Sequence, residues 1–159
     1  MAEPAPAVLA ALADAGLPYR VIVHEQPVHS LQEAAAARGV EVVDVVKTLV
    51  VRRGDDDYLF VLVPGGRQIS WPKLRALLGV SRMSMPPADE AFTATGMRRG
   101  TITPLGSLRP WPVVADAVLA TRSEVTLGSG AHDVAIGVDA AALLEATAAT
   151  VADVTEPEG

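Results

Sequence analysis

Cysteine is absent from this chain of 159 residues, which excludes disulfides, cysteine-ligated zinc, iron–sulfur clusters and a thiol nucleophile of the protein's own. Aromatic side chains are scarce, at 4% of the residues, so the chain offers few platforms for stacking several nucleic-acid bases in a row. Long hydrophobic runs are missing as well, because no segment reaches the roughly 18 uninterrupted apolar residues that a membrane-spanning helix needs. A membrane partner is therefore not expected.

A secretory signal is not expected either, because such a signal begins with a basic stretch and residues 1–4 contain no Lys or Arg. What the chain does contain is apolar mass: 50% of its residues are hydrophobic and 20% are charged, which suits a packed core. The length suits one domain. We expect a compact cytoplasmic protein with a single domain over residues 1–154 and a short tail over residues 155–159.

Positive charge is limited overall and unevenly placed. The net charge is -6, which by itself disfavours a nucleic-acid partner, because phosphate binding is driven by Lys and Arg. Between Lys47 and Arg109, however, ten Lys and Arg stand against five Asp and Glu, a local balance of +5, so the remainder of the chain carries -11. This segment is either a solvated surface without functional meaning or a basic face for an acidic partner.

The order of local signals predicts an α+β fold. Proline or a capping residue starts a run and glycine or a turn ends it, which predicts helices over residues 7–15, 73–78, 88–95 and 140–149, with another short helix between Ser30 and Gly39. β-Branched runs predict strands over residues 19–24, 47–53, 58–63, 101–103, 113–116, 117–120, 125–127 and 134–138. Since regular βαβ alternation is missing, we expect a mixed, largely antiparallel sheet decorated by short helices.

Three familiar motifs are excluded by their spacing or by the residues present. His24 and His29 lie one position too far apart for a zinc-binding H-E-x-x-H motif, and Pro27 would break the helix that this motif needs. Ser129 stands between two adjacent glycines, a tighter turn than the G-x-S-x-G nucleophile elbow. The glycine pair at residues 65–66 is followed by arginine and not by the lysine of a phosphate-binding P-loop. We expect neither a metal nor a cofactor.

Lys47 is the first candidate functional residue, because it opens the apolar run of residues 47–51 and is one of only two lysines in the chain. A lysine among apolar neighbours either extends its ammonium to the surface or points into a cleft. Where a site requires a compact charge on a flexible stem, arginine is a poor substitute.

Two glycine-rich segments are the other candidates. In the first, Gly96 and Gly100 are four residues apart and Pro104 follows four residues later. This spacing fits an ordinary turn, or a backbone that brings several N–H groups close to a ligand. The second, residues 128–133, is either a plain hairpin loop or a pocket wall that carries Ser129 and His132 as its polar groups.

Together these residues resemble the YbaK/prolyl-tRNA-synthetase-associated domain family, the deacylases that hydrolyse mischarged aminoacyl-tRNA. The resemblance covers nearly the whole chain and rests on residues 24–30, 33–35, 46–50, 96–104, 128–132 and 143–144. It implies a mixed sheet that curves toward a partly closed barrel, in agreement with the elements predicted above.

The resemblance also implies roles for individual residues. Lys47 falls on the family's catalytic lysine, and Gly100 falls where backbone groups face the aminoacyl ester. The residues expected to bind substrate are Ser30, Thr48, Gly96, Arg98, Arg99, Thr101, Pro104, Ser129 and His132. The expected partners are the acceptor end of a mischarged tRNA and an aminoacyl-tRNA synthetase, and DNA is not expected.

The activity that the resemblance implies is hydrolysis of mischarged tRNA in trans, in the service of translation fidelity. An aminoacyl ester is already activated, so a positioned water and backbone N–H donors for the oxyanion suffice without a side-chain nucleophile. Two alternatives share the same fold. One is a module that binds aminoacyl-tRNA or a small acyl ligand without turnover, and the other is an interaction domain that accompanies a synthetase.

Overall fold

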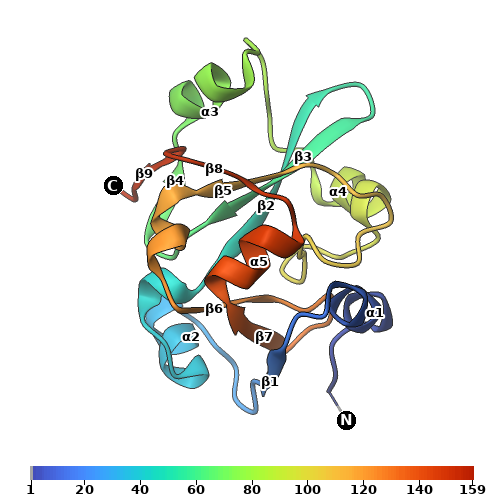
Figure 1. The fold of residues 1–159 in the computed structure, drawn as a ribbon, viewed down its shortest axis with the longest axis vertical. Helices are drawn as coiled ribbons and strands as arrows, with labels where there is room; N and C mark the ends of the chain where they lie inside the picture. Colours follow the sequence, from blue (N-terminus) through green and yellow to red (C-terminus); the bar gives the residue numbers. More distant parts are fainter. Residues whose placement is uncertain (1) are drawn as a thin grey trace.

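The computed structural model describes residues 2–159, which form short helices packed around three β-sheets (Figure 1). The α-helices are α1 (Pro6–Ala15), α2 (Leu31–Arg38), α3 (Trp71–Leu78), α4 (Ala88–Thr95) and α5 (Ala140–Ala146), and the 3-10 helices are η1 (Val42–Asp44) and η2 (Ala117–Thr121). The strands are β1 (Tyr19–Val23), β2 (Lys47–Gly54), β3 (Asp57–Val63), β4 (Arg67–Ile69), β5 (Val113–Asp116), β6 (Glu124–Gly128), β7 (Val134–Asp139), β8 (Thr150–Ala152) and β9 (Thr155–Pro157).

The sheets are mixed but mainly antiparallel. One has the order β1-β7-β6 and is antiparallel throughout, and another pairs β4 with β9. The largest has the order β2-β3-β5-β8, in which β2 and β3 form the predicted antiparallel hairpin and the other two pairings are parallel. An isolated bridge between Val45 and Thr126 connects the start of β2 to β6. The α+β class is confirmed; strand pairing within residues 2–159 does not close a barrel, and partial closure stays a prediction.

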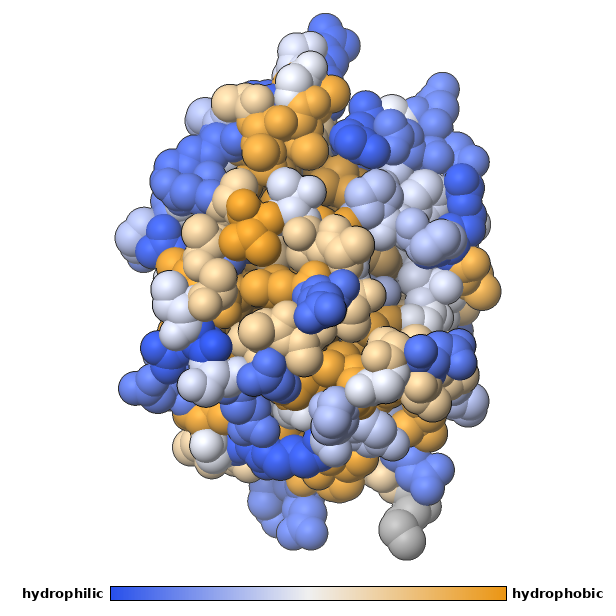
Figure 2. Space-filling model, in the orientation of Figure 1, coloured by the Kyte–Doolittle hydropathy of each residue, from blue (hydrophilic) through white to orange (hydrophobic). Residues whose placement is uncertain are grey.

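Strand β3 is buried on both of its faces, which explains why its sequence is almost continuously apolar. Its alternate residues Tyr58, Phe60 and Leu62 belong to one hydrophobic cluster, which includes residues of α1, α4 and the β1-β7-β6 sheet. The residues between them, such as Leu59 and Val61, belong to a second cluster beneath α3. On the face drawn in Figure 2, apolar surface gathers along the middle and hydrophilic surface along both sides.

Several predicted boundaries differ from the structure, each for a local reason. Residues 101–103 form a loop and not a strand, because the Thr101 N–H turns back to the carbonyl of Arg98. Residues 117–120 form most of η2, because the Asp116 side chain accepts from the Val118 N–H and starts a helical turn there. Helix α5 ends at Ala146 and not at residue 149, since Ala148 has a φ of +50° and the chain continues as β8.

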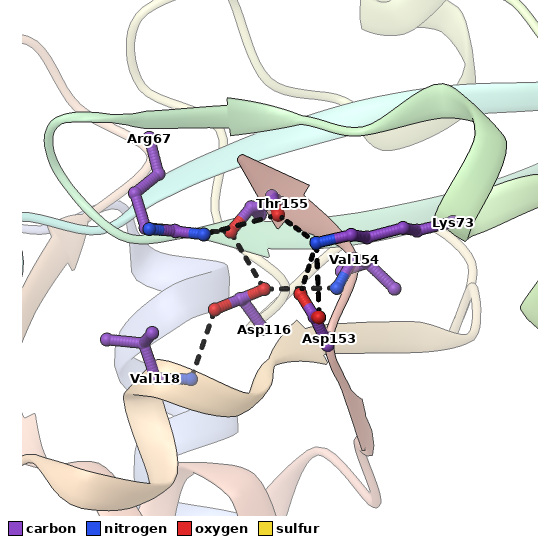
Figure 3. Close-up of polar contacts among 7 residues, drawn as sticks. All are labelled: Arg67, Lys73, Asp116, Val118, Asp153, Val154 and Thr155. Carbon is purple, nitrogen blue, oxygen red and sulfur yellow. Dashed lines mark hydrogen bonds and ion pairs between the residues drawn. The ribbon is translucent and has the colours of Figure 1, made fainter. Parts of the chain in front are cut away.

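The segment expected as a tail, residues 155–159, contains strand β9. This segment is anchored by Asp116, which is only 1% exposed. Its carboxylate accepts hydrogen bonds from the Val154 N–H at 3.1 Å, the Thr155 hydroxyl at 2.8 Å and the Val118 N–H at 3.0 Å (Figure 3). A single buried carboxylate therefore joins the end of β5, the start of η2 and the C-terminal segment.

Two cations strengthen the same anchor. The Lys73 ammonium contacts the Asp153 carboxylate at 3.0 Å and the Thr155 carbonyl at 3.1 Å, and the Arg67 guanidinium donates to the Thr155 hydroxyl at 2.6 Å (Figure 3). Because Arg67 lies on β4 and Lys73 on α3, these contacts tie the last strand to two elements far from it in the sequence.

Replacing Asp116 tests this anchor. Asp116→Asn leaves one acceptor oxygen where two serve three donors, so a buried donor loses its partner and the free energy of unfolding should fall by about 2 kcal/mol. The matched control is Asp153→Asn, whose carboxylate is 66% exposed and should contribute less than about 1 kcal/mol. Urea denaturation measures both. Equal losses in the two variants would contradict the anchoring role of Asp116.

Candidate functional site

A pocket of about 630 Å³ runs beside β2, the strand at the edge of the largest sheet. Its walls come from Arg38 at the end of α2, residues 45–50, residues 85–88 at the start of α4, the loop around Gly100, and Gly128 at the end of β6. A volume of this size is typical of small-ligand sites.

The pocket brings together four of the predicted site residues, Lys47, Thr48, Arg99 and Gly100. The first two follow each other on β2, and the last two belong to a loop about fifty positions further along the chain. Thr48 contributes a buried hydroxyl that has no hydrogen-bond partner within residues 2–159. The fold therefore places the predicted lysine and the predicted glycine loop at one cavity.

Lys47 lines the pocket, but its ammonium is held by two groups that do not. It donates to the backbone carbonyl of Arg67 at 3.0 Å and pairs with the carboxylate of Glu158 at 2.9 Å. The lysine side chain is 37% exposed and the glutamate 47%. An ion pair this exposed is weak, so the ammonium can exchange Glu158 for another anion.

The two glycine-rich segments form one wall of the pocket. Gly100 has a φ of +90°, and a Cβ at this position would meet no atom within 4 Å, so the loop leaves open space beside the glycine. Gly128 allows β6 to approach the loop, since a Cβ there would lie 2.8 Å from the carbonyl oxygen of Ile102. The Gly130 N–H donates to the carbonyl of Thr101 at 2.9 Å and joins the segments.

The remaining predicted binding residues do not line the pocket; they are Ser30, Gly96, Arg98, Thr101, Pro104, Ser129 and His132. Three of them use their hydroxyls in local hydrogen bonds instead, among them Thr101, which donates to the Arg98 carbonyl at 2.6 Å. Ser30 caps α2 by accepting from the Glu33 N–H at 3.0 Å, and the fully buried hydroxyl of Ser129 donates to the carbonyl of Val134 at 2.7 Å. Substrate contact by these seven residues stays a prediction.

Arg38 is a pocket residue that the sequence reasoning missed. Its Nε donates to His24 Nε2 at 3.2 Å and its Nη1 donates to the Thr126 hydroxyl at 3.0 Å. Burial lowers the pKa of this guanidinium, and no carboxylate within residues 2–159 accepts a hydrogen bond from it. A guanidinium that lines a pocket with only neutral partners is suited to bind an anion. In the sequence it resembles an ordinary cation at a helix C-terminus.

Positive charge therefore dominates the pocket. Arg38, Lys47 and Arg99 line it, and its lining residues include no Asp or Glu. Elsewhere in the basic middle of the chain, cations pair with nearby carboxylates: Arg52 with Asp55, Arg53 with Asp57, Lys73 with Asp153 and Arg109 with Asp56. About half of the cations in the predicted basic segment are thus neutralised by carboxylates, and Arg99 is one that lines the pocket without such a partner within residues 2–159.

His24 supports Arg38 and is sensitive to pH. Burial and, to a smaller extent, the charge of Arg38 hold the pKa of His24 below its ordinary value, and Asp133 partly offsets this. The neutral ring accepts the hydrogen bond from Arg38 through Nε2, whereas a protonated ring cannot accept it. Since the folded pKa is the lower one, the free energy of unfolding falls as the pH drops from about 6.5 toward that folded pKa.

An NMR titration of the His24 ring tests this arrangement. We expect a pKa below the ordinary value of about 6.5 in the native protein, and a higher pKa in Arg38→Met, because that variant removes the neighbouring positive charge. Arg75→Met removes an arginine of α3 that lies outside this pocket and serves as the control. A His24 pKa that does not respond to Arg38→Met would contradict the proposed coupling.

Among residues 2–159, no three His, Asp or Glu side chains gather where they could hold a metal ion. Within the same residues, every helix is too short or too polar to cross a membrane.

Comparisons with known proteins match this chain to one family. A family model described as the aminoacyl-tRNA editing domain matches residues 25–146. The proline–tRNA ligase of Thermosipho melanesiensis is 36% identical over 87 residues, which are 55% of this chain and 15% of the ligase. That of Trichlorobacter lovleyi is 30% identical over 111 residues, 70% of this chain and 19% of the ligase. The chain thus spans less than a fifth of the length of these ligases.

A solved structure matches over the full length. It is described as a candidate trans-editing enzyme for prolyl tRNA synthetase, and it superposes with a TM-score of 0.86 at 28% identity, covering 99% of this chain and 100% of that protein.

Proposed function

Because the chain belongs to the aminoacyl-tRNA editing domain family, we propose that it is a deacylase that hydrolyses the ester between a tRNA and a wrongly attached amino acid, acting in trans in the cytoplasm. The full-length match to a candidate trans-editing enzyme supports the mode of action. The similarity to two proline–tRNA ligases supports association with a synthetase.

The observation that carries the proposal is the charge of the pocket. Arg38, Lys47 and Arg99 line a mainly apolar cavity whose lining residues include no carboxylate. The acceptor end of tRNA brings phosphate groups, which bind such cations, and an uncharged aminoacyl side chain suits the apolar lining. One cavity thus offers complementary surfaces to both parts of an aminoacyl-tRNA terminus.

The chemistry requires positioning more than a nucleophile. The pocket lining includes one hydroxyl, that of Thr48, and no Ser, His, Asp or Glu side chain, so a bound water attacks the activated ester. Backbone N–H groups of the Gly100 loop stabilise the oxyanion of the tetrahedral intermediate, and the open space beside Gly100 admits the ester. The walls of the whole pocket set the size of the amino acid that it admits.

Lys47 binds the terminal phosphate or polarises the ester. To do so, its ammonium exchanges the Glu158 carboxylate for the substrate and keeps its hydrogen bond to the Arg67 carbonyl. The exposure of both side chains makes this exchange inexpensive.

Replacing Lys47 tests the catalytic proposal. Lys47→Ala should reduce deacylation of the best substrate in a panel of mischarged tRNAs at least about tenfold, equivalent to ~1.4 kcal/mol of lost transition-state stabilisation. The other lysine of the chain supplies the control, because Lys73 pairs with Asp153 outside the pocket and Lys73→Ala should keep the native rate. An unchanged rate in Lys47→Ala would remove this lysine from the mechanism, and no deacylation of any substrate by the native protein would refute the proposed function.

Separate substitutions of the neighbouring Arg98 and Arg99 test which cations contact the tRNA. Arg99 lines the pocket, whereas Arg98 lies outside it, 4.7 Å above the ring of Phe92. Arg99→Gln should weaken tRNA binding and lower the slope of log affinity against log salt by about 0.7, the value for one phosphate contact with a single strand. Arg98→Gln should change both quantities less, because this guanidinium lies over the Phe92 ring outside the pocket. A salt titration of tRNA binding measures both quantities in the two variants. Equal effects would contradict the assignment of the phosphate contact to the pocket arginine.

A further inference from the structure

The outer edge of β2 is unpaired where it passes the pocket. This strand hydrogen-bonds along its other side to β3 and is the terminal strand of its sheet. On the outer side, the Val46 N–H donates to the Thr126 carbonyl, and Arg52 exchanges two backbone hydrogen bonds with Ser84. Between these two contacts, no other segment within residues 2–159 pairs with the edge.

The orientation of the free groups follows from strand geometry. In an antiparallel pair, alternate residues direct both their N–H and C=O groups to the same side. The outward backbone groups of Val46 and Arg52 are hydrogen-bonded to other segments. Thr48 and Val50 are the alternate residues between these two, so their N–H and C=O groups also point outward. Both residues line the pocket. The cavity thus contains two backbone donors and two backbone acceptors in a fixed row.

Proline keeps this edge open. The antiparallel pairing of Arg52 with Ser84, continued by two residues, would place Pro86 opposite Val50. Proline has no N–H to donate to a strand, so the ladder stops, and residues 85–87 line the cavity instead of covering the edge. An uncovered strand edge is a liability that proteins normally remove, and this one remains available to a ligand.

From this edge we propose that the Thr48–Val50 segment binds the adenine base of the terminal nucleotide of tRNA. Adenine presents an exocyclic N–H donor beside a ring-nitrogen acceptor on each of its hydrogen-bonding edges. The Val50 N–H donates to the ring nitrogen, and a carbonyl of Thr48 or Val50 accepts from the amino group. The apolar lining, including Leu49 and Met85, covers the faces of the ring, and the three cations bind the phosphate.

The inference rests on the proposed function, because it assigns the pocket to the end of a tRNA. The charge of the lining and the neutral edge together favour a nucleotide over a purely anionic or a purely apolar ligand.

Adenosine 5′-monophosphate and inosine 5′-monophosphate test the proposal on the native protein. The two have the same charge and nearly the same shape, but inosine carries an oxygen in place of the amino group and a hydrogen on N1. Its edges therefore place an acceptor where adenine has its amino donor, and its N1 donates where that of adenine accepts. In amide NMR spectra of 15N-labelled protein, the adenine nucleotide should move the Val50 N–H resonance downfield, and the inosine nucleotide should bind at least about tenfold more weakly, since a buried carbonyl then faces an acceptor. Equal affinities, or shifts that avoid residues 48–50, would overturn the proposal.

Val50→Pro removes the outward N–H on an edge strand, one of the strand positions where proline is tolerated. The control is Val50→Ala, which trims the same side chain and keeps the N–H. Affinity for adenosine 5′-monophosphate should be about tenfold lower in the proline variant than in the alanine variant, and equal affinities would count against the edge. If the proline variant does not fold, the comparison of the two nucleotides decides.

A deacylation assay on the same preparation separates this inference from the proposed function. Deacylation without nucleotide contact at residues 48–50 would overturn the edge proposal alone. Nucleotide contact there without deacylation of any mischarged tRNA would overturn the deacylase and leave the edge proposal standing.

Discussion

The burial of β3 on both faces is the constraint on which the rest of the structure depends. Its side chains alternate between two hydrophobic clusters, so the strand lies in the interior of the sheet between β2 and β5. Strand β2 has β3 as its only strand partner in this sheet and becomes its edge. The pocket lies along that edge, and so a requirement of core packing determines where Lys47, Thr48 and the free backbone groups meet a ligand.

The pocket concentrates positive charge and neutralises it only weakly. Arg38 is held by a histidine and a threonine, and Lys47 is held by a carbonyl and an exposed carboxylate. Three cations line the pocket without a lining carboxylate, and the Glu158 carboxylate that pairs with Lys47 is exposed, so an anionic ligand can reduce the repulsion among these cations. The arrangement is better explained by ligand binding than by stability, since exposed ion pairs elsewhere on the surface neutralise similar cations locally.

Sequence reasoning predicted the features that depend on neighbours along the chain. The β2-β3 hairpin and most helix positions have local signals, whereas the grouping of Lys47 with the Gly100 loop came from the resemblance to the editing family. Arg38 had none, because it reaches the pocket through contacts with residues as distant as Thr126. Ser129 was proposed for the pocket, yet its hydroxyl is buried in a hairpin. Strand β9 was missed because it has three residues, one of them proline, and forms only by pairing with β4.

The C-terminal segment connects stability to the site through two contacts of very different strength. At one end the buried carboxylate of Asp116 holds residues 154 and 155 with hydrogen bonds that water does not weaken. At the other end, Glu158 reaches the Lys47 ammonium with both side chains partly in solvent. Because the anchor is strong and the contact at the lysine is weak, Glu158 can give up its place to a phosphate while β9 stays paired with β4. The segment can therefore hold Lys47 ready in the empty pocket and release it to a substrate without unfolding.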